Sequence, residues 1–337
     1  MNPRPALAFL LLLVCGSPLA FTADLAPPFL PAPIAPGGFV LPLYAPDSPK
    51  LNRARLGEAE RTNPHADGKG DRVQSVLNIH NPSVEVHLAQ GRAVNGAAVI
   101  VAPGGGHKIL WVGPEGSDFA TFFANYGVST IILRNRLRID GYEPRTDAVS
   151  DALQAIRLVR SRAAEWKIDP AKIGIMGLSA GAELAAATAL EFAATTPHAA
   201  TVAGDPLAAV SARPDFVALV YPGPTAFNRA PAPTIPADVP PTFLMCPGSG
   251  DRVHALWATE YFTAMLKAGV PNLEMHIYGR GGHGGGLKDR DGIPLGTWQL
   301  RYIEWFRDLG FLGKPGVETR AAQEVAAFVR KPTQPSK

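Results

Sequence analysis

The feature that most constrains the fold is a regular alternation of short apolar runs with longer amphipathic stretches, which begins near residue 84. Residues 97–102 are continuously apolar, as in a strand buried on both faces, whereas residues 147–166 show the apolar spacing of a helix. The other predicted strands are residues 84–89, 128–133, 172–176, 216–221, 242–246 and 273–278, and the other predicted helices are residues 119–126, 180–192, 254–268 and 297–309. This alternation predicts an α/β fold with a mostly parallel central sheet that helices cover on both faces.

The first residues of the chain have the pattern of an export signal. Arg4 precedes a leucine-rich run at residues 6–14 that is too short to span a bilayer, and small residues follow it. Cys15 follows Val14 instead of a small residue, which disfavours a lipoprotein. We therefore predict a signal peptide at residues 1–23 and a periplasmic or secreted protein.

The rest of the chain divides into three predicted parts. Residues 24–71 are a proline-rich arm and loop, residues 72–312 form one folded domain, and residues 313–337 are a C-terminal tail. No other segment is long and apolar enough to cross a membrane, so the mature protein is expected to be soluble.

The cysteine content argues against a disulfide, and the charge argues against a nucleic acid partner. Cys246 is the one cysteine left after removal of the signal, so we expect no intramolecular disulfide. The net charge is only +3 and no basic cluster with interleaved aromatics is present, so no nucleic acid partner is predicted. The oligomeric state is not indicated.

The sharpest motif is Gly177-Leu178-Ser179-Ala180-Gly181, between a predicted strand and a predicted helix. A serine at such a tight turn projects out of the sheet, and the flanking glycines leave room for the strained backbone. Ser179 is therefore the candidate nucleophile, with the N–H of Ala180 directed at the attacked carbonyl. The same five-residue pattern alone would be weak, because a glycine-rich chain can contain it by chance.

A second glycine-rich motif, Pro103-Gly104-Gly105-Gly106-His107, directly follows the buried strand at residues 97–102. It could be only a flexible loop. Backbone N–H groups without side chains in the way can also stabilise a developing oxyanion, and a loop after an early strand is where they are needed. The predicted oxyanion hole is Gly105, Gly106 and Ala180, and His107 is a candidate contact to the substrate.

A third motif, Gly281-Gly282-His283-Gly284-Gly285-Gly286, follows the last predicted strand. A histidine late in the chain can take the serine proton and return it to the leaving group. His283 is thus the candidate base.

The acid that orients this base should follow the strand at residues 242–246. The loop there offers one carboxylate, Asp251, which could instead be only the N-cap of the helix that begins near His254. If it is only a cap, the loop after residues 216–221 is the next place to search.

With these motifs, the stretch 98–286 resembles the bacterial carboxylesterases of the α/β-hydrolase superfamily that are like acetyl xylan esterase and hormone-sensitive lipase. The matching runs include Ala102 to Gly106, Ile173 to Gly181, Lys267 to Pro271 and Gly281 to Gly284. The resemblance implies an α/β-hydrolase fold, catalytic Ser179, Asp251 and His283, no cofactor and no metal. It also implies an ester substrate, with acetyl groups on plant polysaccharide preferred.

The sequence departs from these relatives at two places. They often carry an Asp-Asp pair in the acid loop and use the first, where this chain has Gly250, so Asp251 must reach from one residue further on. They also commonly have a glycine–histidine pair after the serine motif, where this chain has Ala182-Glu183, and we assign Glu183 no catalytic role.

Several alternatives stay open at this point. A general short-chain carboxylesterase or a feruloyl esterase would use the same site. A peptidase of the prolyl-oligopeptidase kind shares the core but needs a further large domain. A non-catalytic glycan-binding protein on a decayed hydrolase fold is the other alternative, because the acid loop is altered.

Overall fold

A computed structural model describes residues 26–64, 72–91, 94–193, 205–288, 292–313 and 319–329. The predicted signal peptide at residues 1–23 lies outside these described residues. In the part of the chain that is described, no helix combines the length and the apolar character needed to cross a membrane.

Eight described strands form one sheet in the order β1-β4-β6-β5-β7-β8-β9-β10. Their bounds are β1 (Phe39–Pro42), β4 (Ser83–His87), β5 (Ala98–Ala102), β6 (Ser129–Arg134), β7 (Ile173–Leu178), β8 (Val217–Val220), β9 (Thr242–Pro247) and β10 (Glu274–Tyr278). β4 is antiparallel to both β1 and β6, and every other neighbouring pair of this sheet is parallel. The prediction of an α/β fold with a mostly parallel sheet is confirmed.

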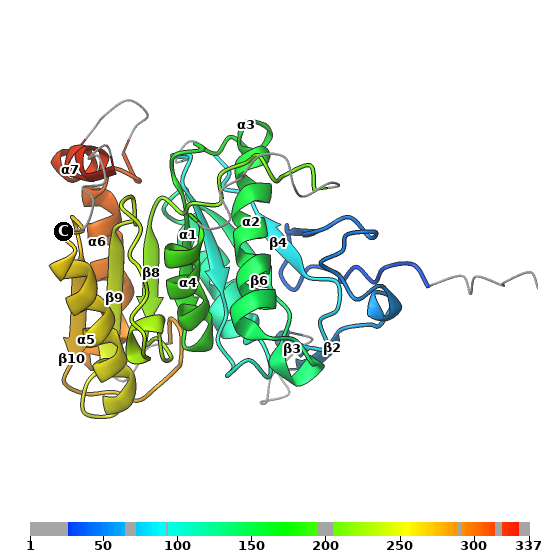
Figure 1. Ribbon diagram of the computed structural model, residues 1–337, viewed down its shortest axis with the longest axis horizontal. Coiled ribbons are helices and arrows are strands. Elements are labelled where there is room, and N and C mark those ends of the chain that lie inside the picture. The colour runs from blue at the N-terminus through cyan, green and yellow to red at the C-terminus, as the bar shows by residue number, and fades with distance from the viewer. Residues whose placement is uncertain are drawn as a thin grey trace, which may run out of the picture.

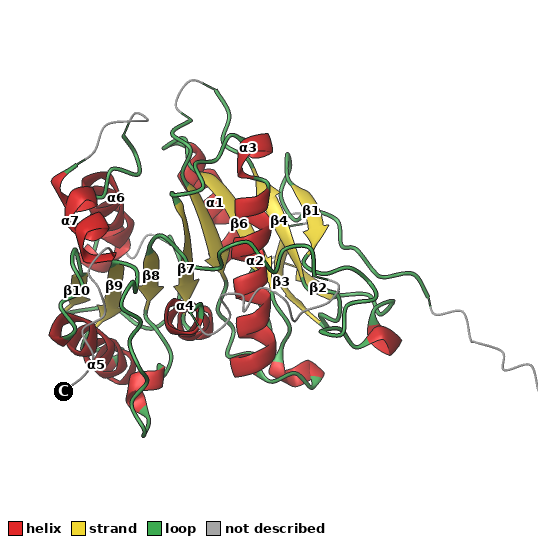
Figure 2. Cartoon of the chain, turned by 45° about the horizontal axis from the view of Figure 1, so that its top comes forward, coloured by secondary structure: helices red, strands yellow, loops and turns green. Residues whose placement is uncertain are grey.

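Helices cover both faces of the sheet. One face carries α2 (Val149–Ser161), α4 (Ala180–Glu191) and α5 (Arg252–Lys267), and the other carries α1 (Asp118–Ala124) and α6 (Trp298–Asp308) (Figures 1 and 2). Strand residues alternate between the two cores. Along β5, Ile100 contributes to the first core, and Val99 and Val101 to the second. This alternation explains why the strand is apolar at every position.

Some elements differ from the sequence prediction. The helix expected over residues 147–166 is interrupted at Arg162, whose backbone leaves the helical region, so a short α3 (Ala163–Trp166) follows α2. Elements without a sequence prediction are β1, the hairpin of β2 (Arg61–Pro64) and β3 (Val73–Leu77), and α7 (Arg320–Val329). Short helical turns lie at Arg53–Arg55, Gly113–Ser117, Arg138–Asp140, Pro144–Ala148, Ala226–Asn228 and Pro294–Thr297.

The proline-rich arm is attached to the sheet edge rather than separate from it. β1 pairs along β4, and the buried carboxylate of Glu85 accepts hydrogen bonds from the N–H groups of Ile34 and Ala35 at 2.9 and 3.2 Å. Glu85 also pairs with the buried guanidinium of Arg134 at 2.7 Å. Prolines cannot donate backbone hydrogen bonds, so side-chain and edge contacts fix this segment instead.

Candidate active site

Ser179 lies at the turn between the end of β7 at Leu178 and the start of α4 at Ala180. Its backbone has φ 54° and ψ −119°, a conformation that L residues rarely adopt. The turn is possible because its flanks carry no side chains. A Cβ on Gly177 would lie 2.0 Å from the carbonyl oxygen of Gly181, and a Cβ on Gly181 would lie 2.0 Å from that of Ala102. Helix and strand therefore approach each other only with glycine at both places.

A continuous chain of hydrogen bonds joins Ser179, His283 and Asp251. The hydroxyl of Ser179 lies 2.8 Å from Nε2 of His283, and Nδ1 of the same ring lies 2.7 Å from Oδ2 of Asp251. Asp251 is only 7% exposed, whereas His283 is exposed. Since a carboxylate oxygen can only accept, Nδ1 of His283 carries the hydrogen and Nε2 presents its lone pair to the serine. This is the tautomer that a base for Ser179 needs.

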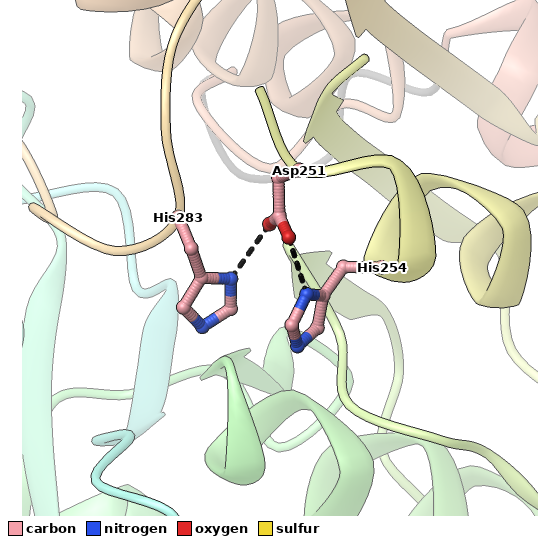
Figure 3. Close-up of side chains that lie close together, drawn as sticks. All are labelled: Asp251, His254 and His283. Carbon is pink, nitrogen blue, oxygen red and sulfur yellow. Dashed lines mark hydrogen bonds and ion pairs between the residues drawn. The ribbon is translucent and has the colours of Figure 1, made fainter. Parts of the chain in front are cut away.

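Asp251 takes the N-cap position of α5, but its side chain caps no backbone N–H group. Instead, its second oxygen, Oδ1, lies 2.5 Å from Nδ1 of His254, in the first turn of the helix. The carboxylate therefore stands between two imidazoles, as Figure 3 shows. The alternative in which Asp251 only caps the helix lacks the hydrogen bond that it requires.

The missing side chain at position 250 has a steric explanation. A Cβ on Gly250 would lie 1.7 Å from the carbonyl oxygen of Gly281, in the loop that carries His283. The acid loop and the histidine loop thus approach each other where related chains often have an aspartate. The tight approach leaves Asp251, one residue further on, as the carboxylate that reaches His283.

The predicted oxyanion loop follows β5. Gly105 has φ +133°, and a Cβ there would lie 2.1 Å from the carbonyl oxygen of Ile109, so only glycine fits. The N–H groups of Gly105, Gly106 and Ala180 donate no hydrogen bond to any described residue. These donors are available for a ligand, and that of Ala180 lies at the positive end of a helix.

A buried carboxylate, that of Glu115, links the oxyanion loop to the histidine loop. It accepts hydrogen bonds from the N–H of Gly104 at 2.7 Å and from the hydroxyl of Tyr221 at 3.0 Å. Tyr221 in turn accepts from the N–H of Gly286 at 3.0 Å, and its ring meets that of His283 edge-on at 5.0 Å. Burial raises the pKa of Glu115, while the two hydrogen bonds act in the opposite direction. The network holds both loops in fixed register.

His107 lies beside a cavity of about 260 Å³ that also borders Glu183 and Arg229. Its Nε2 lies 3.2 Å from Glu183, and Arg229 donates to the other oxygen of that carboxylate at 3.2 Å. Glu183 is one turn after Ser179 on α4, so the cavity is next to the serine. A larger cavity of about 890 Å³ lies on the other side of the histidine loop, with Trp111, Phe122 and Lys288 among its lining residues.

One group of described side chains has the composition of a metal site, namely Asp251, His254 and His283, whose ligand atoms lie within 4.8 Å of one another. Both Nδ1 atoms already bond to the carboxylate, and Nε2 of His283 faces Ser179. These three nitrogen atoms are therefore already engaged in hydrogen bonds.

The structure brings together the sequence-predicted Ser179, Asp251 and His283, and places Gly105, Gly106 and Ala180 on the two segments that meet at the serine. Sequence reasoning missed His254, Glu115 and Tyr221. For His254 a signal was present, because a residue three positions after an N-cap returns to it on the first helical turn. For Glu115 and Tyr221 no local signal exists, since their partners come from other elements.

Comparisons with known proteins bear on the fold and the family. Residues 143–279 match a family described as having the alpha/beta hydrolase fold. The chain is 25% identical over 243 residues to an acetylxylan esterase of Xylanibacter ruminicola, which covers 64% of this chain and 45% of that protein. It is 31% identical over 125 residues to endo-1,4-beta-xylanase B of Butyrivibrio fibrisolvens, which covers 37% of this chain and 19% of that protein. The chain thus spans less than half the length of either relative.

Solved structures show the same fold. An acetyl ester-xyloside bifunctional hydrolase from Caldicellulosiruptor lactoaceticus superposes with a TM-score of 0.65 at 26% identity, over 86% of this chain and 100% of that one. The esterase Est2 of Thermogutta terrifontis superposes with a TM-score of 0.59 at 20% identity, over 84% of this chain and 96% of that one. The predicted resemblance to acetylxylan esterase-like carboxylesterases is confirmed, and the chain has the α/β-hydrolase fold.

Proposed function

We propose that this protein is a serine esterase that cleaves carboxylic esters through an acyl-enzyme. The observation that carries the proposal is the unbroken chain from the hydroxyl of Ser179 through His283 to Asp251, with steps of 2.8 and 2.7 Å. These lengths are those of good hydrogen bonds in a structure without substrate.

The proposed reaction has two halves. Nε2 of His283 takes the proton of Ser179 as the oxygen attacks the ester carbonyl, and then gives that proton to the leaving alcohol. Asp251 keeps the ring in the required tautomer and stabilises its positive charge. The N–H groups of Gly105, Gly106 and Ala180 stabilise the tetrahedral oxyanion, and removal of one such donor typically costs about 3 kcal/mol of barrier. Water then releases the acid by the same steps.

As substrate we propose acetyl groups on plant polysaccharide. The support comes from two relatives, an acetylxylan esterase and an acetyl ester-xyloside bifunctional hydrolase. The cavity beside Ser179 supports a polar alcohol, because His107, Glu183 and Arg229 offer both donors and acceptors to sugar hydroxyls. We further propose export to the periplasm or the medium, on the signal pattern of residues 1–23.

Two experiments test this function. Purified protein should hydrolyse p-nitrophenyl acetate, and Ser179→Ala should lower turnover by a factor on the order of 10⁴ or more without unfolding. Ser150→Ala is the matched control, since this serine contacts Tyr44 and Lys50 away from the proposed nucleophile. Equal turnover in wild type and Ser179→Ala would refute the proposal, and a wild type without turnover would favour the glycan-binding alternative.

The substrate is tested separately. A panel of acetylated xylan, feruloyl esters and aliphatic esters of increasing chain length should show the highest kcat/KM on acetylated xylan. A higher value on feruloyl or longer aliphatic esters would leave the esterase mechanism in place and replace the polysaccharide substrate.

A further inference from the structure

Asp251 serves two imidazoles at once. Its Oδ2 accepts from Nδ1 of His283 at 2.7 Å and its Oδ1 from Nδ1 of His254 at 2.5 Å (Figure 3). These two are the only hydrogen bonds of the carboxylate to described residues. Among the described residues, no backbone N–H group donates to this carboxylate, although it lies at a helix N-terminus. The position of the carboxylate therefore depends on the ring of His254.

The ring of His254 is itself held firmly. It stacks on the ring of His283 with centroids 3.9 Å apart and planes inclined by 28°. The ring of Trp257 meets it edge-on at 5.0 Å on α5. The side chain of His254 is 20% exposed. Burial lowers the pKa of His254, the hydrogen bond to Asp251 acts in the opposite direction, and the charge of His283 lowers it again. A neutral ring with hydrogen on Nδ1 is therefore the form that fits this place.

The acid loop explains why such a support is needed. Gly250 approaches the carbonyl oxygen of Gly281 too closely for any side chain, so the acid is displaced by one residue onto the first residue before α5. Asp251 there has φ −150° and ψ 54°, outside the helical region. Among the described residues, His254 is the one donor besides His283 that holds this carboxylate.

We propose that His254 is a positioning residue, which donates to Asp251 and thereby holds the carboxylate in line with Nδ1 of His283. This inference rests on the proposed esterase function. It assigns His254 no contact with the substrate, because its hydrogen bond and its stack are both directed at the other two members of the cluster.

Other ionisable groups also face this cluster. Glu115 acts on His283 from the turn before α1, and Tyr221 faces it from the end of β8. The thiol of Cys246, on β9, donates to the carbonyl oxygen of His254 at 3.8 Å, and burial raises its pKa. None of these groups donates to Asp251, so removal of His254 leaves His283 as the one described donor to the carboxylate.

Two substitutions separate the hydrogen bond from the ring. His254→Phe keeps an aromatic ring for the stack but removes the donor, whereas His254→Asn keeps an N–H donor near the place of Nδ1 without the ring. We expect kcat of His254→Phe to fall by roughly tenfold or more, as for loss of a hydrogen bond to a charged group, with KM within about threefold of wild type. His254→Asn should stay within about threefold of wild-type kcat.

A matched control is His276→Phe. His276 also pairs with a carboxylate, that of Glu274 at 2.7 Å, but it lies on β10 away from the serine. It should leave kcat and the pH profile unchanged. Unchanged kcat in His254→Phe, with only a lower Tm, would overturn the inference, and so would equal losses of kcat in His254→Phe and His254→Asn.

A measurement without turnover separates this inference from the esterase proposal. Each Nδ1–H that donates to Asp251 should give a downfield proton resonance in NMR spectra, two in wild type and one in His254→Phe. A single such resonance in wild type would overturn the inference. If wild type hydrolyses no ester but shows both resonances, the esterase proposal fails while the assignment of the two donors stands.

Discussion

Asp151 and Asp251 are two buried carboxylates that each meet nitrogen donors, yet their surroundings differ completely. Asp151, on α2, is fully buried and accepts from Nε, Nη2 and the backbone N–H of Arg136 at 3.0, 2.8 and 3.0 Å. The remaining N–H groups of Arg136 donate to Asp147 and to the carbonyl oxygen of Lys50. Every group in this pair is matched by another protein group, so the pair can contribute only to the fold.

The two donors to Asp251 are imidazole rings, and each ring has a second nitrogen that does not bond to the carboxylate. Nε2 of His283 bonds to the hydroxyl of Ser179, which a substrate can reach, because Ser179 is only half-buried and His283 is exposed. When arginine donates to a buried carboxylate, the pair is a fixed structural contact, because the guanidinium stays protonated. When histidine donates to it, the ring keeps a second nitrogen that can accept a proton at neutral pH. The comparison predicts that substitution of Asp251 lowers turnover, whereas substitution of Asp151 lowers the free energy of unfolding.

The largest effect should come from substitution of His283 or Ser179, which follow Asp251 in the series of hydrogen bonds. His283→Ala should lower turnover by a factor on the order of 10⁴ or more, about as much as Ser179→Ala, because serine and histidine act as one unit. The double variant should be no worse than either single one. Steady-state hydrolysis of p-nitrophenyl acetate measures this, and a larger loss in His107→Ala than in His283→Ala would mean that the base is His107.

Asp251→Asn tests the carboxylate itself. We expect turnover to fall by a factor on the order of 10²–10⁴, because an amide next to Nδ1 favours the wrong tautomer of His283. The Tm should change little, because asparagine has nearly the same shape and the Asp251 side chain makes no capping hydrogen bond that could be lost. Near-normal turnover would remove Asp251 from the proposed site and direct the search to the loop after β8.

Asp151→Ala should show the opposite behaviour. It leaves the guanidinium of Arg136 buried without its main partner, which typically costs about 3–5 kcal/mol of folding free energy. Urea denaturation measures this loss, and kcat per folded molecule should stay near wild type. A large fall in kcat in a folded Asp151→Ala protein would end the distinction between the two carboxylates.

Most of the fold could be predicted because its strands are buried on both faces. Continuous apolar runs such as β5 and β6 leave little choice of structure. β1 was missed because a proline-rich arm gives no strand pattern, and its pairing with β4 is a tertiary contact. The break at Arg162 was missed because the apolar spacing continues into α3 although the backbone does not.

In the site, the sequence predicted the residues whose local backbone is unusual. Ser179 needs a glycine on each side, and that requirement is visible in the motif itself. Glu115 gave no comparable pattern, because what distinguishes it is a set of partners in other segments. The same reason applies to Gly250, whose steric limit comes from Gly281 and appears only when the two loops are in place.

The smallest effect should come from substitution of a third carboxylate, that of Glu183, which is neither fully buried like Asp151 nor bonded to His283 like Asp251. Glu183 is one turn beyond Ser179 and accepts from His107 and Arg229 at 3.2 Å each, but its side chain is 18% exposed. Its carboxylate accepts fewer hydrogen bonds than that of Asp151, and no described hydrogen bond links it to His283. Glu183→Gln should therefore leave kcat and Tm close to wild type, because partly exposed ion pairs contribute up to about 1 kcal/mol.

If the cavity at Glu183 receives the alcohol part of the substrate, the effect of this change should appear in KM. We expect KM for acetylated xylan to rise by about threefold, while KM for p-nitrophenyl acetate, which has no sugar hydroxyls, stays unchanged. Arg157→Gln is the control, since Arg157 donates to the carbonyl oxygen of Val210 away from the cavity. An equal rise for both substrates would show that Glu183 acts through the fold. A fall in kcat by more than about tenfold would place it, like Asp251, among the groups on which the chemical step depends.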